Sequence, residues 1–169
     1  MKSLIEIKVE DSILDYFLNL PKPSPSKVSS GTKNGDQTSN IIEIVDPNLI
    51  LHLKENYLIP SINKIKGNYN FKDINLEWIH HIHYKSQGEQ SVHNHEDFED
   101  FSFILYLNNC SDGHTIFYTF PKPTIITPFK GKLILFKSHL YHEAVKTTNS
   151  KQVIVGSVQL QEKTWNLRP

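Results

Sequence analysis

The chain has 169 residues, 38% of them hydrophobic and 21% charged, which is typical of one globular domain with its own core. Its 18 basic and 18 acidic residues cancel, so no basic excess favours nucleic acid as a partner. The single cysteine, Cys110, excludes an internal disulfide and a cysteine-rich zinc site and favours a reducing compartment. No apolar run reaches membrane-spanning length, and the N-terminus becomes acidic too early for a signal peptide. We therefore expect a cytoplasmic protein without a membrane partner.

Residues 1–73 are predicted to form a helical and loop region. LIEIKV, at 4–9, is typical of a short strand, and SILDYFLNL, at 12–20, has the apolar spacing of a helix. Residues 21–40 are rich in proline, serine, glycine and asparagine, which predicts a long segment that is either a lid or simply flexible. We favour a flexible 21–40 segment, because nothing in it suggests a grip on a substrate.

A helix is expected to follow this segment. Asp46 and Pro47 are a good N-cap and first-turn pair. They precede NLILHLKENYL, at 48–58, whose apolar residues recur at helical spacing. Pro60 is expected to end or restart this helix.

From residue 74 onward the hydrophobic pattern changes to period two, which is typical of strands. The runs are INLEWIHHIHY, SFILYLN, HTIFYTF, TIITPF, KLILFK, LYHEAV and QVIVGSVQL, and turn signals such as NNCSDG and TTNS separate them. No helical run lies between them, which favours an antiparallel sandwich or barrel of jelly-roll type. We therefore predict a mainly β fold with flanking N-terminal helices: one domain over 1–169 with a jelly-roll core at 74–160.

Six of the nine histidines fall between residues 80 and 114. Strand alternation from residue 78 to 84 places Trp78, His80, Ile82 and Tyr84 on one face and the three intervening residues on the other. On this pattern His80 is expected to be a core or pocket-lining residue.

A metal site is predicted from three other histidines. His93 and His95 are two residues apart, so on a strand both imidazoles share one face, although this spacing is also common in surface strands. His142 would face inward if Tyr141 and Glu143 face outward. The open end of a jelly-roll would bring the three histidines together.

Several short motifs, in this order, resemble the iron(II)- and 2-oxoglutarate-dependent oxygenases. The resemblance covers roughly residues 74–160 and is closest to the prolyl 4-hydroxylase-like branch and to small phage-encoded members. The motifs are Tyr84, Gly88, His93, YLN at 106–108, GHTIF at 113–117, PFKGKLILF at 128–136, His142 and Lys151.

This resemblance implies a double-stranded β-helix, which is a jelly-roll, with iron(II) and the co-substrate 2-oxoglutarate as cofactors. The family holds iron with an H-x-D or H-x-E pair and a distal histidine. His93 matches the first histidine and His142 the distal one. Tyr84 matches a tyrosine that contacts 2-oxoglutarate, and Lys151 stands where the family has a cation for its far carboxylate. Arg168 lies too near the chain end for that role.

The sequence departs from the family at the iron-binding carboxylate, where it has His95. Two alternatives stay open. In the first, His93, His95 and His142 bind the metal as three neutral ligands. In the second, the pattern shifts by two residues and His95 pairs with Asp97. The spacing from Tyr84 to His93 favours the first.

The resemblance implies a dioxygenase that hydroxylates a C–H bond of a prolyl, other peptidyl or small-molecule substrate and releases succinate and CO2. For a phage-encoded chain the compartment would be the host cytoplasm. One alternative is a cupin-like three-histidine dioxygenase that does not use 2-oxoglutarate, and another is a non-catalytic jelly-roll binding module. Fold analogy does not choose the substrate. Four apolar residues are expected in the pocket or core: Phe103, Leu105, Phe117 and Leu135.

Overall fold

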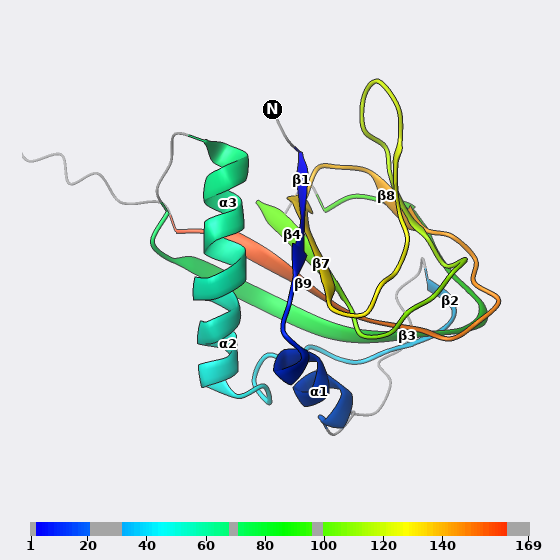
Figure 1. Ribbon diagram of the computed structural model, residues 1–169, viewed down its shortest axis with the longest axis horizontal. Coiled ribbons are helices and arrows are strands. Elements are labelled where there is room, and N and C mark those ends of the chain that lie inside the picture. Colours follow the sequence, from blue (N-terminus) through cyan, green and yellow to red (C-terminus); the bar gives the residue numbers. More distant parts are fainter. Residues whose placement is uncertain (1–2, 21–31, 68–70, 96–99, 162–169) are drawn as a thin grey trace, which may run out of the picture.

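The computed structural model describes residues 3–20, 32–67, 71–95 and 100–161. In these ranges the chain forms an antiparallel nine-stranded sheet that curls into a barrel, with helices along one side (Figure 1). The strands are β1 (Leu4–Lys8), β2 (Thr32–Gln37), β3 (Ile74–His93), β4 (Phe101–Tyr106), β5 (Thr115–Phe117), β6 (Thr124–Ile126), β7 (Lys132–Lys137), β8 (His142–Ala144) and β9 (Lys151–Leu160). The helices are α1 (Asp11–Asn19), α2 (Pro47–Leu53) and α3 (Ile59–Lys66), with a π-helical turn, η1 (Lys54–Leu58), between the last two.

The long strand β3 joins the two halves of the barrel. The first half contains β1, β7, β4 and β9, and the second contains β8, β5 and β6. The strand order is β1-β7-β4-β9-β3-β8-β5-β6, and the first part of β3 pairs with β9 while its end pairs with β8. The chain bends between these parts at Gln87, which has a φ of 67°, and Gly88. A Cβ on Gly88 would lie 2.7 Å from the Lys85 carbonyl oxygen and 2.8 Å from that of Asn34, so only glycine fits. This topology is a double-stranded β-helix and confirms the predicted mainly β jelly-roll class with flanking N-terminal helices.

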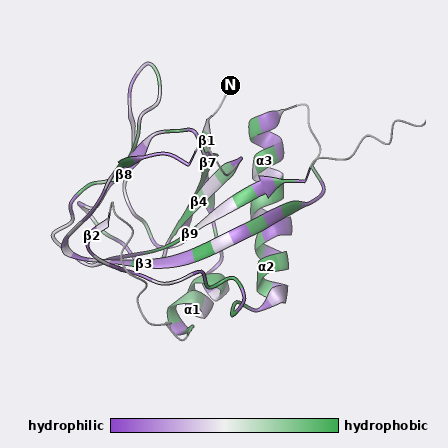
Figure 2. Cartoon of the chain, turned by 180° about the vertical axis from the view of Figure 1, so that it is seen from behind, coloured by the Kyte–Doolittle hydropathy of each residue, from purple (hydrophilic) through white to green (hydrophobic). Residues whose placement is uncertain are grey.

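The helices cover the outer face of the first half. They carry both hydrophobic and hydrophilic residues (Figure 2), and the hydrophobic ones pack on the sheet. Because strand side chains alternate, Leu105 and Leu135 join this helix-side core, whereas Tyr106 and Phe136 point into the barrel and form a second cluster. The barrel interior is thereby separated from the helix-side core by the sheet itself.

The α2–α3 segment begins and restarts as its sequence indicates. The Asp46 side chain accepts a hydrogen bond from the Asn48 backbone N–H at 2.8 Å, and Pro47 occupies the first helical turn. Pro60 cannot donate a backbone hydrogen bond, and the wider turn η1 lies directly before it. The helix therefore restarts at α3 and does not end there.

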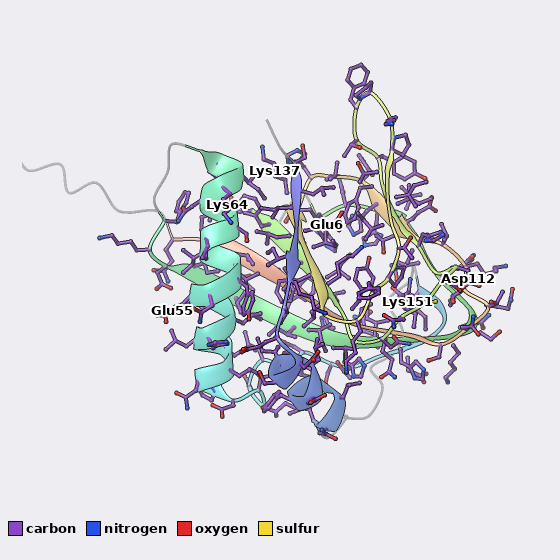
Figure 3. The ribbon with its side chains drawn as sticks, viewed as in Figure 1. Glu6, Glu55, Lys64, Asp112, Lys137 and Lys151 are labelled. Atoms are coloured by element: carbon purple, nitrogen blue, oxygen red, sulfur yellow. The ribbon has the colours of Figure 1, made fainter. Side chains whose placement is uncertain are left out.

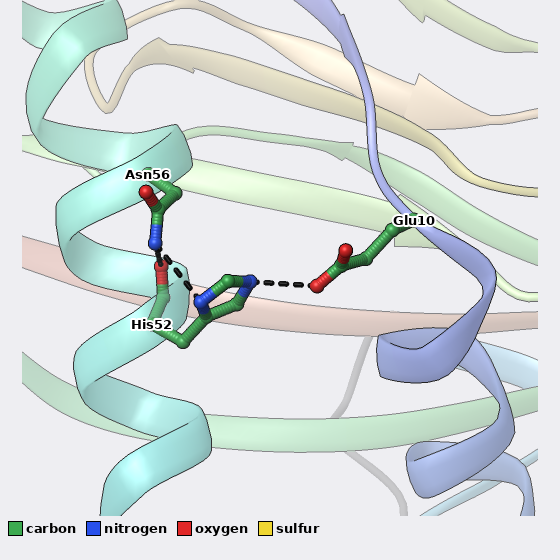
Figure 4. Close-up of polar contacts among 3 residues, drawn as sticks. All are labelled: Glu10, His52 and Asn56. Atoms are coloured by element: carbon green, nitrogen blue, oxygen red, sulfur yellow. Dashed lines mark hydrogen bonds and ion pairs between the residues drawn. The ribbon is translucent and has the colours of Figure 1, made fainter.

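A surface contact joins α2 to the start of α1 (Figure 4). His52 Nε2 lies 2.6 Å from Glu10 Oε1, and the Asn56 side-chain amide lies 2.9 Å from His52 Nδ1. Both partners of the ion pair are nearly half exposed, so its contribution to stability is small, roughly 0–1 kcal/mol.

The prediction of a flexible segment over 21–40 is wrong for its second half. Residues 21–31 lie outside the described ranges, but Thr32–Gln37 form β2, which pairs with β3 on both sides of the bend. Its sequence, TKNGDQ, has no strand propensity of its own. Backbone pairing and the ion pairs Lys33–Glu89 (3.0 Å) and Lys85–Asp36 (2.8 Å) join it to β3. Its contacts with β3, and not its own sequence, therefore make this segment a strand.

Within the described residues, no helix has both the length and the apolar character needed to cross a membrane.

Candidate metal centre

The barrel encloses a cavity of about 520 Å³ whose walls come from both halves of the sheet. Its lining contains all five residues that the sequence predicts for the site: His93, His95, His142, Tyr84 and Lys151. Residues up to 67 positions apart thus meet in one space, because β3, β8 and β9 are neighbours in the sheet.

Three histidines form a cluster at this cavity, which we call the histidine cluster: His93, His95 and His142. His93 ends β3 and pairs directly with His142, which begins β8. His95 follows two residues later, and its backbone N–H donates to the Ser138 carbonyl at 2.9 Å. Each side chain offers one ring nitrogen, and these nitrogens lie within 4.8 Å of one another. Among the described residues this is the group suited to hold a metal ion.

Two of these imidazoles are oriented by backbone carbonyls. His93 Nδ1 lies 2.8 Å from the Ser91 oxygen, and His142 Nδ1 lies 2.9 Å from the Leu140 oxygen. A carbonyl only accepts, so each Nδ1 carries a proton, and in the neutral ring Nε2 is then the nitrogen with the free lone pair. This is how metal-binding histidines are oriented in proteins.

Two members of the cluster, His95 and His142, are neutral near pH 7. Burial, and next the neighbouring His93, lower the pKa of His142 to about 3 and that of His95 to about 4. A metal ion therefore displaces no proton from these two rings when it binds near pH 7.

A buried cation lines the same cavity. Lys151 is only 1% exposed and stands at the start of β9, opposite Tyr84 on β3. Its ammonium donates to the Gly113 carbonyl at 2.9 Å and lies 4.4 Å from the centre of the Tyr84 ring, a cation–π contact. Burial lowers the pKa of Lys151 to about 8, which the nearby Cys110 and Asp112 partly oppose. Figure 3 labels Lys151 and Asp112 on the side of the barrel away from α2 and α3.

Two hydroxyl-bearing side chains, Tyr84 and Thr115, also line the cavity. Burial raises the pKa of Tyr84 above its usual value, so its phenol stays protonated and is able to donate. Thr115 also lines the cavity, and its Oγ1 accepts a hydrogen bond from the Tyr106 hydroxyl at 2.7 Å. The sequence reading missed Thr115. The sequence does carry a signal for it. Thr115 lies two residues before Phe117, so strand alternation places both on the inward face of β5.

The remaining wall is mostly apolar and aromatic. Trp78, His80, Ile82 and Tyr84 all face the cavity, which confirms the predicted alternation. The Trp78 ring centre lies 4.9 Å from that of His80 and 6.0 Å from that of His95. His80 Nδ1 contacts the Thr38 carbonyl at 2.9 Å, so His80 lines the pocket and stays outside the histidine cluster.

The four apolar residues expected in the pocket or core divide between these places. Phe103 belongs to the helix-side core and also lines the cavity, Leu105 and Leu135 belong to the helix-side core, and Phe117 belongs to the barrel cluster. Asp97, the alternative carboxylate ligand, and Arg168 lie outside the described residues.

The donor set suits a borderline divalent metal ion. Imidazoles bind iron, zinc, copper and nickel, and three ligands on one face leave coordination positions open. With a buried ammonium in the same cavity, the arrangement suits an anionic ligand that reaches both the metal and Lys151.

No protein-family model matches the sequence, and the curated proteins give no match either. Solved structures do match the fold. An oxidoreductase of the 2OG-Fe(II) oxygenase family from Burkholderia pseudomallei superposes with a TM-score of 0.70 at 12% identity, over 93% of this chain and 85% of that one. HygX from Streptomyces hygroscopicus, with nickel and 2-oxoglutarate bound, has a TM-score of 0.68 at 13% identity, over 99% and 90%.

A prolyl-4-hydroxylase from Pseudomonas putida also superposes, with a TM-score of 0.65 at 12% identity, over 95% of this chain and 94% of that one. Identities this low establish a shared fold and leave the chemistry to the site. The chain therefore has the fold of the 2-oxoglutarate- and iron(II)-dependent oxygenases, including prolyl 4-hydroxylases, as the resemblance implied. The link to phage-encoded members stays a prediction.

Proposed function

We propose that this protein is an iron(II)- and 2-oxoglutarate-dependent dioxygenase that hydroxylates a C–H bond of a peptidyl, for example prolyl, or small-molecule substrate. One observation carries the proposal: a cluster of three imidazoles and a buried ammonium line the same cavity. The shared fold with enzymes of this class supports it.

The histidine cluster would hold the iron through the Nε2 atoms of His93 and His142 and one ring nitrogen of His95. Iron(II) bound there would let dioxygen convert 2-oxoglutarate to succinate and CO2 and deliver one oxygen atom to the substrate. The backbone carbonyls of Ser91 and Leu140 keep two of the rings aimed, so the ligand geometry exists before the metal arrives.

The lysine end would hold the far carboxylate of 2-oxoglutarate. Lys151 is a buried ammonium that donates to the Gly113 carbonyl and lies over the Tyr84 ring, so a carboxylate in the cavity would give it a direct counter-charge. The Tyr84 hydroxyl, kept protonated by burial, would donate to the same group, and Thr115 lies in the same wall.

The three-histidine set has a chemical consequence. Neutral ligands leave the full charge of the divalent ion uncompensated, whereas a family-type carboxylate would neutralise one unit. The carboxylate and oxo group of the co-substrate would supply that compensation. Iron and 2-oxoglutarate therefore strengthen each other's binding at this site, a reciprocal coupling.

The substrate would meet the wall formed by Trp78 and His80, next to His95. This wall is aromatic, and Lys151 is committed to the co-substrate, which suits an uncharged group at the reacting end of the substrate. A prolyl-4-hydroxylase among the structural neighbours supports a prolyl or other peptidyl side chain.

The two alternatives make different use of the cavity. A cupin-like dioxygenase without 2-oxoglutarate would leave the buried Lys151 without an anionic ligand in the cavity during turnover. A non-catalytic module would have no use for three converging imidazoles, two of them oriented by backbone carbonyls. We therefore place the 2-oxoglutarate enzyme first.

Turnover without substrate tests the proposal. Wild-type protein with iron(II), 2-oxoglutarate and dioxygen should form succinate and CO2 slowly, and Lys151→Met should form far less at the same concentrations. Lys132→Met is the matched control, because Lys132 also begins a strand but pairs with Glu6 outside the cavity. Oxygen uptake without succinate would favour the cupin-like enzyme, and no uptake at all would favour the binding module.

A further inference from the structure

The main chain on both sides of Lys151 is hydrogen-bonded by the side chain of Asn108, in addition to the pairing of β9 with β3. Asn108 Oδ1 accepts a hydrogen bond from the Gln152 backbone N–H at 2.7 Å, and Asn108 Nδ2 donates to the Ser150 carbonyl at 2.9 Å. These two peptide groups flank Lys151. The last strand residue of β4 is Tyr106, and the Leu107 N–H still donates to the Gln152 carbonyl at 2.9 Å, so the Asn108 amide extends the β4–β9 contact by one side chain.

The ammonium of Lys151 is held by a different segment, the loop at 110–114. Its acceptor is the Gly113 carbonyl, at 2.9 Å. The neighbouring Asp112 carboxylate accepts hydrogen bonds from the Thr148 backbone N–H at 2.8 Å and the Thr147 hydroxyl at 2.9 Å, and also from the Thr148 hydroxyl. Asp112 thereby fastens the loop that presents the Gly113 carbonyl.

The two segments pack closely at Gly113. A Cβ added there would lie 3.0 Å from Thr147 Cβ and 3.1 Å from Cys110 Sγ. The loop therefore has little room to shift relative to the Thr147 segment, and the position of the Gly113 carbonyl follows from the Asp112 contacts.

Contacts at both the backbone and the ammonium restrict the conformations of a lysine side chain. The lysine side chain is a flexible four-carbon stem that loses roughly 2 kcal/mol of rotamer entropy when it is fixed. A single carbonyl at 2.9 Å does not by itself set the direction of the whole stem. Fixing the backbone at its base and the acceptor at its tip sets both ends.

We propose that Asn108 and Asp112 are positioning residues that aim Lys151 at the distal carboxylate of the co-substrate. They thereby set the selectivity of the cavity for 2-oxoglutarate over 2-oxo acids that lack that carboxylate. The inference rests on the proposed function and concerns residues that do not line the cavity themselves.

The test compares two 2-oxo acids. The dissociation constants of 2-oxoglutarate and of pyruvate, which has no distal carboxylate, are measured anaerobically with the iron-loaded protein for wild type, Asn108→Ala and Asp112→Asn. Asn56→Ala is the matched control, because Asn56 lies on η1, away from the residues that line the cavity, and its side-chain amide contacts His52. Iron affinity and the thermal midpoint of each variant are recorded as well.

Asn108→Ala should weaken 2-oxoglutarate binding about tenfold, the effect of losing one well-placed hydrogen-bonded contact. Asp112→Asn should weaken it less, because an amide oxygen still accepts from the Thr148 N–H. Pyruvate and iron affinity should be unchanged in both, and Asn56→Ala should match wild type throughout.

The outcomes separate this inference from the proposed function. Equal losses for both 2-oxo acids would show a general structural role and overturn the inference, as would full retention of the 2-oxoglutarate preference in both variants. In either case the proposed function stands. A wild-type protein that binds both acids equally would overturn the proposed role of Lys151 together with this inference.

Discussion

The two faces of strands β4, β7 and β9 are built from different kinds of residue. The face against the helices is hydrophobic and fully buried, as at Leu105, Leu135 and Ile154. The face toward the barrel interior carries buried polar groups, such as Lys151 and Ser102, among its apolar residues. The helix face therefore supplies stability, whereas the cavity face holds groups that cost stability and are useful only when a ligand binds.

The largest expected effect is on the helix face. Leu135→Ala should lower the free energy of unfolding by about 3 kcal/mol, because it removes a fully buried side chain and leaves a cavity. Denaturant unfolding measures this, with Leu135→Met as the control that keeps the volume and costs less than about 1.5 kcal/mol. Iron affinity of the folded protein should not change. A loss of iron binding would contradict the separation of the two faces.

On the cavity face, His142→Ala should lower iron(II) affinity more than about a hundredfold, since it removes a ligand and even indirect partners of ligands cost 10–100-fold. Competition with a chelator gives the affinity. The matched control is His80→Ala, which changes a histidine of the same cavity outside the histidine cluster. Equal losses in both variants would mean that the cavity as a whole, and not the cluster, binds iron.

Lys151→Met should stabilise the ligand-free protein by about 2 kcal/mol at pH 7. The difference between its pKa of about 8 and the ordinary value near 10.5 corresponds to about 3 kcal/mol, and an unpaired Gly113 carbonyl takes back about 1 kcal/mol. The folded pKa is depressed, so the charged lysine penalises wild type fully below pH 8, and the penalty disappears as pH rises toward 10.5. Unfolding of both proteins at pH 7 and pH 10 measures the stability difference between Lys151→Met and wild type at each pH. A variant less stable than wild type at pH 7 would contradict this prediction.

The smallest expected effect is on the pH dependence of co-substrate binding. Above pH 8 the free protein loses the Lys151 proton, so 2-oxoglutarate affinity should fall about tenfold for each further pH unit, with little change from pH 6.5 to 7.5. Of the groups beside Lys151, Tyr84 has a raised pKa and Asp112 a lowered one, so neither titrates in this range. Cys110→Ser tests the thiol and should keep the profile. A flat profile up to pH 9.5 would contradict a role for the ammonium.

The sequence predicted those parts of the protein that depend on local pattern. Period-two runs placed β3 to β9, and strand alternation put Tyr84, His80 and Trp78 on the cavity face. The convergence of His93, His95 and His142 was expected because two residues on one strand and one on another meet at the open end of a jelly-roll.

What the sequence did not predict depends on contacts between distant segments. β2 has a polar sequence and exists through its pairing with β3, about 50 residues later. Asn108 and Asp112 acquire their roles from the loop at 147–152, which reaches them only after β9 joins β4 in the sheet. Side-chain hydrogen bonds to a backbone 36 to 44 residues away leave no periodic signal in the sequence.

The central claim is that the histidine cluster and Lys151 serve one ligand in one cavity. The most direct measurement is an anaerobic titration of iron(II) and then 2-oxoglutarate into metal-free protein, read by the visible metal-to-ligand charge-transfer band. We expect the band of the wild-type protein to saturate at about one equivalent of 2-oxoglutarate. In Lys151→Met saturation should require far more 2-oxoglutarate, and Lys132→Met should behave as wild type. Iron binding with no band in wild type, or identical titrations for wild type and Lys151→Met, would contradict this claim.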